Sequence, residues 1–275
     1  LPLAMAVLGY GGMVPAGALQ DSVFVGELAL DGSLRAVPGA INVALATRDA
    51  GRRRLFVPEA CAGEAAAVAD VEVYGVRSLV HLVEALHGRQ PLERAAPPVL
   101  AEATRCVVDL AVLRGQQRAR RALEVAAAGG HNLLMVGPPG CGKTLLARAL
   151  PGIMPPLSLD ESLEVTRIHS ASGLTLRRSG LIRRRPFRAP HSTASYAALV
   201  GGGNPPGPGE ISLAHRGVLF LDETTEFPRR SLEALRAPLE DRFVTVARAG
   251  RSVQFPATLS LVCALNPCPR GLGYS

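Results

Sequence analysis

The 275-residue chain has a single lysine, few aromatic side chains and no closely spaced pair of cysteines. Its five cysteines are Cys61, Cys106, Cys141, Cys263 and Cys268. This scattered, odd-numbered set argues against a disulfide-rich secreted scaffold and against a structural zinc site, and it fits a cytoplasmic protein. Aromatic residues make up 4% of the chain, so we do not expect recognition of nucleic-acid bases by stacking.

Long unbroken apolar runs are also missing. Residues 1–20 carry no charge, but prolines and glycines interrupt them well short of the ~18 apolar residues of a membrane span. No basic flank accompanies them, as a signal peptide would require. We therefore expect no membrane segment and predict a buried helix at about residues 2–8.

Charge is distributed unevenly. Residues 1–100 have a net charge of −2, whereas residues 101–275 have a net charge of +9. A polyanionic partner is therefore expected for the second part only. Of the 30 basic residues, 29 are arginine, and the one lysine is Lys143.

The order of apolar segments predicts two units joined by a linker. Strands and helices alternate over residues 1–90, which is typical of a compact α/β or α+β domain. Residues 91–104 begin PLERAAPP and are typical of a linker, and residues 105–275 form the second unit. In the first unit we predict strands over residues 23–30, 54–57 and 71–74, and helices over 40–50, 61–68 and 78–87.

The second unit contains the sequence motif of a phosphate-binding loop. A helix over 115–128 and a short apolar strand over 132–136 precede a GxxxxGK[ST] motif, and a helical run follows over 145–150. In this setting backbone N–H groups surround a β-phosphate, Lys143 supplies a compact positive charge and Thr144 ligates Mg²⁺. A planar guanidinium suits that cradle poorly, which explains why an arginine-rich chain uses lysine here. The predicted ATP-binding residues are Gly137, Pro138, Pro139, Gly140, Cys141, Gly142, Lys143 and Thr144.

Two later strands end in polar residues. Residues 217–223 read GVLFLDE, so Asp222 is predicted to hold the Mg²⁺ shell and Glu223 to activate the attacking water. A third strand over 259–265 ends at Asn266, whose amide fits a γ-phosphate sensor. The catalytic residues are therefore predicted to be Lys143, Glu223 and Asn266.

These motifs resemble those of the AAA+ ATPases, in the Mg-chelatase-like branch of YifB and ComM. The resemblance includes the stretches RPFRAPH (185–191), GGGNPPGPGEISLAH (201–215), LEALRAPLED (232–241) and NPCP (266–269). It also covers residues 26–38, which look like part of a Lon-protease-type domain. The implied fold class is α/β: a P-loop AAA+ core with a parallel sheet flanked by helices, preceded by a partial Lon-protease-like α+β domain.

The resemblance implies a function as well. It suggests ATP hydrolysis with Mg²⁺ by a homo-hexameric ring that drives DNA branch migration during natural transformation. A magnesium-chelatase motor subunit and a nucleotide-dependent assembly protein with little turnover remain alternatives. The lid and the arginine that a neighbouring subunit inserts are expected to lie beyond residue 275.

The sequence departs from the branch at three places. Ser192 replaces a second histidine, Arg270 replaces a cysteine, so no metal role is carried over to Cys268, and Thr224-Thr225 replaces Leu-Pro, which we take as a harmless loop change. A Lon-type protease needs a Ser–Lys dyad, but Ile41 occupies the lysine position. The first unit is therefore expected to be proteolytically inactive.

Arginines mark the predicted DNA contacts. Residues 177–188 hold six arginines in twelve positions, with no acidic residue among them. Residues 243–255 read as a hairpin with two arginines at its tip. Clustered arginines neutralise phosphates, so the predicted DNA-contacting residues are Arg183, Arg184, Arg185, Arg248 and Arg251.

Overall fold

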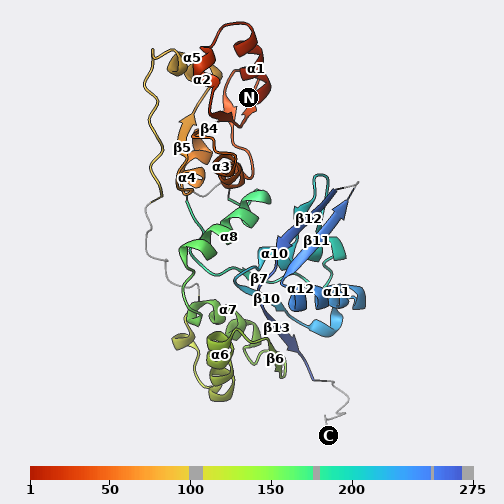
Figure 1. Cartoon of the computed structure of the whole chain (residues 1–275). Helices are drawn as coiled ribbons and strands as arrows, with labels where there is room; N and C mark the ends of the chain where they lie inside the picture. Colours follow the sequence, from red (N-terminus) through yellow and green to blue (C-terminus); the bar gives the residue numbers. More distant parts are fainter. Residues whose placement is uncertain (99–107, 176–179, 249–250, 268–275) are drawn as a thin grey trace. The chain divides into compact units, whose positions relative to one another are not determined.

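The computed structural model describes residues 1–98, 108–175, 180–248 and 251–267 (Figure 1). Contacts divide the chain into two compact units. The first comprises Leu1–Leu100 and His169–Leu181, and the second comprises Ala101–Ile168 and Ile182–Ser275. Among the described helices, none is both long enough and apolar enough to cross a membrane.

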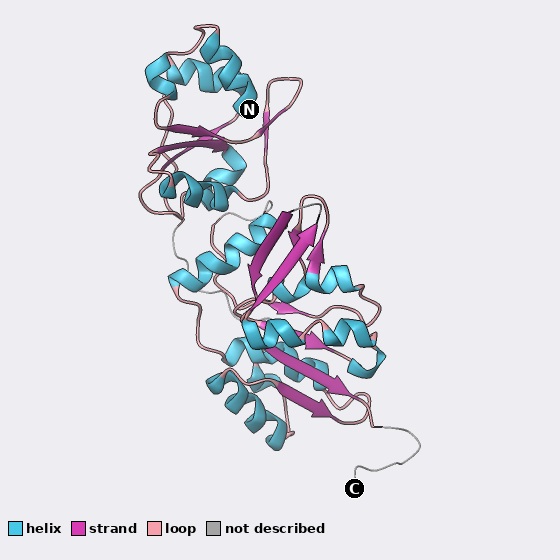
Figure 2. Ribbon diagram, turned by 45° about the vertical axis from the view of Figure 1, so that its right-hand side comes forward, coloured by secondary structure: helices cyan, strands magenta, loops and turns pink. Residues whose placement is uncertain are grey.

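The first unit is built on a three-stranded parallel sheet in the order β1-β4-β5, with helices on both faces (Figure 2). A small antiparallel pair, β2 and β3, lies beside it. The apolar core includes Met5, Phe56 and Leu82. The elements are α1 (Pro2–Tyr10), α2 (Ala16–Leu19), β1 (Ser22–Phe24), β2 (Glu27–Leu28), β3 (Leu34–Arg35), α3 (Ala40–Asp49), β4 (Arg54–Pro58), α4 (Glu59–Ala65), β5 (Glu72–Val76) and α5 (Leu79–Leu86).

The predicted strand over 23–30 is wrong as a single element. The backbone at Gly26 adopts φ +147°, which side-chain-bearing residues rarely adopt, and the chain changes direction there. Before it, the N–H of Val25 still pairs with the carbonyl of Phe56 at 2.9 Å. After it, β2 pairs with β3 instead of with the main sheet.

The second unit is built on a four-stranded sheet in the order β6-β13-β10-β7, and every pair of neighbours is parallel. The predicted parallel sheet flanked by helices is therefore confirmed. The described helices and strands that follow α5 are η1 (Leu110–Val112), α6 (Gln117–Gly129), β6 (Leu133–Val136), α7 (Lys143–Ile153), α8 (Leu159–Ala171), β7 (Phe187–Arg188), α9 (Tyr196–Val200), β8 (Gly201–Gly202), β9 (Gly207–Pro208), α10 (Glu210–Leu213), β10 (Val218–Leu221), η2 (Thr224–Glu226), α11 (Arg229–Glu233), α12 (Arg236–Asp241), β11 (Phe243–Arg248), β12 (Arg251–Pro256) and β13 (Ser260–Leu265).

Alternate residues of the central strands face two separate cores. Val218 and Phe220 of β10 pack with residues of α6 and α7. Leu219 and Leu221 pack on the opposite face with residues of α9, α10 and the β11–β12 hairpin. This alternation follows from the two-residue period of a strand and buries both faces of the sheet.

Strand β6 is less buried than its apolar composition suggests. It pairs only with β13 in the described sheet, and Leu134 and Val136 are 59% and 51% exposed. Its apolar composition identified a strand but not its position at the edge. Position in a sheet depends on the order of pairing, which a single strand's sequence does not specify.

The predicted hairpin over 243–255 is confirmed. Strands β11 and β12 pair antiparallel, with Phe243 opposite Pro256 and Arg248 opposite Arg251. The turn at 249–250 lies outside the described residues.

Candidate nucleotide site

The phosphate-binding loop connects β6 to α7, as the sequence predicts. Gly140 has φ +76°, and Gly142, which directly precedes α7, has φ +93°. Both conformations are left-handed and favour glycine. Because the strand, loop and helix follow one another directly, the backbone N–H groups at the start of α7 lie beside the loop, where the helix dipole favours an anion.

Lys143 is the most enclosed polar group of the loop, with 9% exposure. Its Nζ donates to the carbonyls of Gly137 at 2.6 Å and Pro138 at 3.0 Å, and to Oδ1 of Asn266 at 2.9 Å. A mobile surface lysine would not make three such bonds. The ammonium therefore lies between the loop and the end of β13, where the sequence predicts the terminal phosphates.

Thr144 and Asp222 form the second contact of the site. The Thr144 hydroxyl donates to Oδ2 of Asp222 at 2.8 Å. This separation is close to the ~3 Å between adjacent oxygens in an octahedral Mg²⁺ shell, and both are the hard oxygen ligands that Mg²⁺ prefers. The two residues therefore fit a Mg²⁺ ion that phosphate oxygens and water would complete. Among the described residues there is no cluster of three His, Cys, Asp or Glu side chains that could hold a metal alone.

Asn266 contacts Glu223, the remaining predicted residue of the site. Its Nδ2 lies 3.4 Å from Oε1 of Glu223, while its Oδ1 accepts from Lys143. Strands β6, β13 and β10 are neighbours and parallel, so their carboxyl ends meet at one edge of the sheet. The structure thus brings together Lys143, Thr144, Asp222, Glu223 and Asn266, which span more than a hundred residues of sequence.

Two further residues that contact this site were not predicted from the sequence. Nε2 of Gln116, just before α6, donates to the carbonyl of Cys141 in the loop at 3.4 Å. The hydroxyl of Thr224 donates to the carbonyl of Leu221 at the end of β10, at 2.9 Å. Neither belongs to a motif whose chemistry could be inferred from spacing.

Comparison with known proteins places the chain in a family. The family described as "Magnesium chelatase, subunit ChlI" matches residues 109–274, more than half of the chain. The chain belongs to the Mg-chelatase-like family of YifB and ComM. A second family description, "Subunit ChlI of Mg-chelatase", matches residues 1–61. The predicted AAA+ α/β fold is confirmed with the family.

Individual relatives cover nearly all of this chain. Competence protein ComM of Haemophilus influenzae is 44% identical over 275 residues, which are 98% of this chain and 54% of ComM. YifB of Salmonella typhimurium is 44% identical over 275 residues, 98% of this chain and 53% of YifB. The chain therefore spans about half the length of these curated relatives. A magnesium chelatase complex of subunits BchI and BchD, based on a single-particle cryo-EM reconstruction, has a TM-score of 0.48 and 24% identity, covering 62% of this chain and 58% of that chain.

In this YifB/ComM-type chain the predicted DNA-contacting arginines differ in their surroundings. Arg184 is exposed and Arg183 is half-buried, but Arg185 donates to the carbonyls of Pro155 at 2.6 Å and Arg216 at 2.8 Å. Its guanidinium also pairs with Glu161 at 3.4 Å, and 11% of the side chain is exposed. Arg185 is thus held by protein groups in this structure, and we leave it out of the DNA proposal. Arg248 and Arg251 are opposite each other in the backbone pairing at the end of the hairpin.

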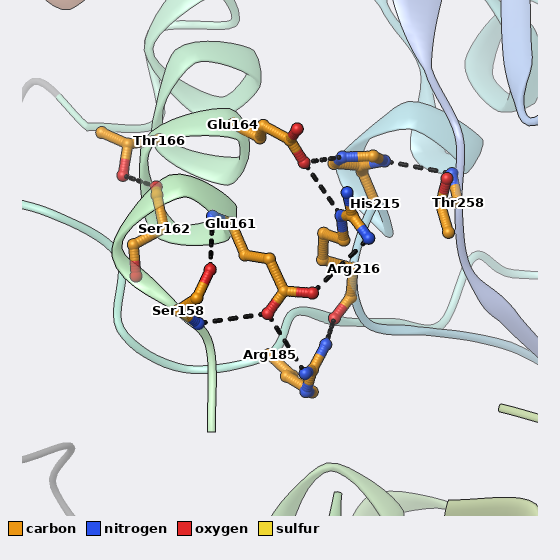
Figure 3. Close-up of polar contacts among 9 residues, drawn as sticks. All are labelled: Ser158, Glu161, Ser162, Glu164, Thr166, Arg185, His215, Arg216 and Thr258. Atoms are coloured by element: carbon orange, nitrogen blue, oxygen red, sulfur yellow. Dashed lines mark hydrogen bonds and ion pairs between the residues drawn. The ribbon is translucent and has the colours of Figure 1, made fainter. Parts of the chain in front are cut away.

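Arg185 lies at one end of a polar network that Figure 3 shows. His215 is 2% exposed; its Nδ1 accepts from the N–H of Thr258 at 3.0 Å and its Nε2 lies 3.1 Å from Glu164. Arg216 donates to the same Glu164 oxygen at 2.8 Å. The network ties α8 to the segments just before β10 and β13, at the sheet edge opposite the nucleotide site.

The chemistry of His215 makes this network sensitive to pH. Burial lowers the pKa of His215 below its ordinary 6.5, against the opposing effect of Glu164. Burial raises the pKa of Glu164, but hydrogen bonds from Arg216 and His215 outweigh it, so the net shift is downward. The unfolded chain binds the His215 proton more readily, so this contribution to stability is present above pH 6.5 and is lost as pH falls below it.

We expect the wild-type free energy of unfolding to decrease as the pH is lowered from 7.5 to 5.5. His215 should contribute up to about 1.4 kcal/mol per pH unit to this decrease. Replacing His215 with glutamine should flatten this dependence and cost about 1–3 kcal/mol at pH 7.5, because the part-buried N–H of Thr258 loses its acceptor. Urea unfolding at both pH values measures this. His191→Gln, at an exposed histidine, is the control and should keep the wild-type pH dependence. Equal pH dependence in His215→Gln and wild type would contradict the assignment.

Proposed function

We propose that this chain carries the ATP-binding and ATP-hydrolysing core of an AAA+ motor. The convergence of Lys143, Thr144, Asp222, Glu223 and Asn266 at one sheet edge is the observation that supports the proposal most. Each residue type matches one requirement of phosphoryl transfer to water: charge neutralisation, metal ligation, water activation and sensing of the γ-phosphate. Steady-state ATP hydrolysis by the full-length protein, beside its Glu223→Gln variant, tests it.

In the proposed mechanism each group acts at one place. Thr144 and Asp222 would hold Mg²⁺, which would supply positive charge to neutralise the phosphates. Lys143 exchanges its loop carbonyls for phosphate oxygens and places its charge between the two phosphates. Glu223 orients a water and accepts its proton, and the Asn266 amide holds that water against the γ-phosphate.

We further propose that the motor acts on DNA, as a ComM-like ring that drives branch migration in recombination and natural transformation. The net charge of +9 over residues 101–275 and the exposed side chain of Arg184 support a polyanionic partner. We propose a homo-hexamer for the full-length protein and a cytoplasmic location. The domain division at residues 1–90, 91–104 and 105–275 belongs to the same proposal.

The first unit is proposed to be a binding or assembly domain without protease activity. Ile41, at the position where a Lon-type protease carries its lysine, is fully buried. Its N–H donates to the carboxylate of Glu64 at 3.1 Å. A hydrocarbon side chain at this point offers no base for a serine nucleophile.

Binding to DNA should weaken steeply with salt, because each neutralised phosphate contributes a slope of about 0.7–0.9 in log K per decade of salt. Replacing Arg248 and Arg251 with alanine should lower the slope by about 1.4–1.8 without favouring any sequence. Fluorescence anisotropy with the full-length protein at several salt concentrations measures this. The control is the double alanine variant of Arg229 and Arg236, which pair with Glu233 and Glu240. An unchanged slope for the hairpin variant would show that Arg248 and Arg251 do not contact DNA phosphates.

A magnesium-chelatase motor subunit is the second candidate, since both matching family descriptions name that enzyme's ChlI subunit. The two candidates differ in what ATP hydrolysis drives. Branch migration of three- and four-strand DNA junctions by the full-length protein supports the first. Inactivity on DNA, with ATP-dependent magnesium insertion into a porphyrin in the presence of chelatase partner subunits, supports the second.

A further inference from the structure

The backbone at Glu223 has an unusual conformation. Its φ of 49° and ψ of 50° are left-handed, which a side-chain-bearing residue adopts only when its surroundings hold it there. The Glu223 carbonyl accepts from the N–H of Glu226 at 2.8 Å, and the Glu223 N–H donates to Asp222 Oδ1 at 3.1 Å. The direction of the Glu223 carboxylate therefore depends on the tight turn that follows β10.

One side chain fastens this turn to the sheet. The Thr224 hydroxyl donates to the carbonyl of Leu221 at 2.9 Å, which closes the four-residue turn around Glu223. The same hydroxyl lies 3.3 Å from the carbonyl of Ala264 in β13. It thus links the end of β10 to β13 just before Asn266.

The neighbouring threonine makes no comparable contribution. Thr224 is half-buried and bonded to two strands, whereas Thr225 is exposed. The sequence alone gives no reason to distinguish them, because they are identical residues next to each other in one short loop. The geometry separates them by burial and by hydrogen bonding.

We propose that Thr224 is a positioning residue for ATP hydrolysis: its hydroxyl fixes the turn that aims the Glu223 carboxylate at the water beside Asn266. This inference rests on the proposed function of the site. Thr224 itself is expected to touch neither phosphate nor water. Its removal should therefore slow turnover and leave nucleotide affinity unchanged.

Three variants of the full-length protein test the proposal. Thr224→Val keeps the shape and removes the hydroxyl, Thr224→Ser keeps the hydroxyl, and Thr225→Val makes the same change at the exposed neighbour. We expect Thr224→Val to lower kcat by about 10- to 100-fold, since a displacement of about 1 Å can cost ~10²-fold. The kcat of Thr224→Ser should lie within about threefold of the wild-type value, and the kcat of Thr225→Val should equal the wild-type value. The dissociation constant of a fluorescent ATP analogue should stay within about twofold throughout.

The outcomes separate this inference from the proposed function. If wild type turns over ATP and Thr224→Val matches it, or if Thr224→Ser is as slow as Thr224→Val, the positioning role is overturned and the proposed function stands. If wild type has no ATPase activity, both are overturned. A Thr224→Val variant that loses nucleotide affinity in parallel with kcat would show a general loss of structure, and would also overturn the positioning role.

Discussion

Glu223→Gln is expected to bind ATP as tightly as wild type and to lower kcat by about 10²–10⁴-fold, the usual contribution of a general base. Glutamine keeps the size of the side chain and its contact with Asn266 but cannot accept a proton from water. Among the described residues that would contact the phosphates, the Glu223 carboxylate hydrogen-bonds Asn266 alone, so affinity should not change. Steady-state phosphate release and titration with a fluorescent ATP analogue measure the two quantities separately.

Glu226→Gln is the matched control for that experiment. Glu226 is an exposed acidic residue in the 3₁₀ turn that directly follows Glu223, so its replacement changes the local charge equally without touching Asn266. It should keep wild-type kcat. A Glu223→Gln protein that hydrolyses ATP at the wild-type rate would mean that another residue activates the water.

Lys143→Ala is expected to weaken ATP binding by about 10- to 150-fold. This range corresponds to the loss of one charge-assisted hydrogen bond worth about 1.5–3 kcal/mol. The substitution also leaves the carbonyls of Gly137 and Pro138 without their donor, so the thermal midpoint must be measured beside the titration. Wild-type affinity in a folded Lys143→Ala protein would contradict the assignment of the loop.

Lys143→Arg distinguishes charge from shape at this position. Arginine keeps the positive charge, but its planar guanidinium replaces a compact ammonium that has three bonding partners within 3.0 Å. We expect this variant to bind ATP more weakly than wild type. Full affinity would show that charge alone suffices, and the explanation for the single lysine of the chain would then fail.

The nucleotide site was predictable because its parts follow local rules. A glycine-rich loop between a strand and a helix is recognisable in sequence, and the carboxyl ends of parallel strands meet at one edge. Lys143, Asp222 and Asn266 could therefore be assigned before any distance was known. Their contacts in the structure agree with that order of strands, and the functional roles remain our proposal.

The features that could not be predicted depend on contacts between distant segments. The edge position of β6 depends on which strands pair with it, and the break at Gly26 depends on a competing partner strand. Arg185 reads as a surface charge in a basic run, yet Pro155, Glu161 and Arg216 hold its guanidinium. Thr224 resembles an ordinary turn residue until its contact with Ala264 is known.

A structure of the full-length Glu223→Gln protein with ATP and Mg²⁺ tests the central claim most directly. We predict Lys143 Nζ within hydrogen-bonding distance of the β- and γ-phosphate oxygens, and Mg²⁺ on the hydroxyl of Thr144 and near Asp222. Asn266 and the glutamine at 223 should flank a water in line with the γ-phosphate. A nucleotide bound elsewhere, or a γ-phosphate without contact to Lys143 and Asn266, would contradict it.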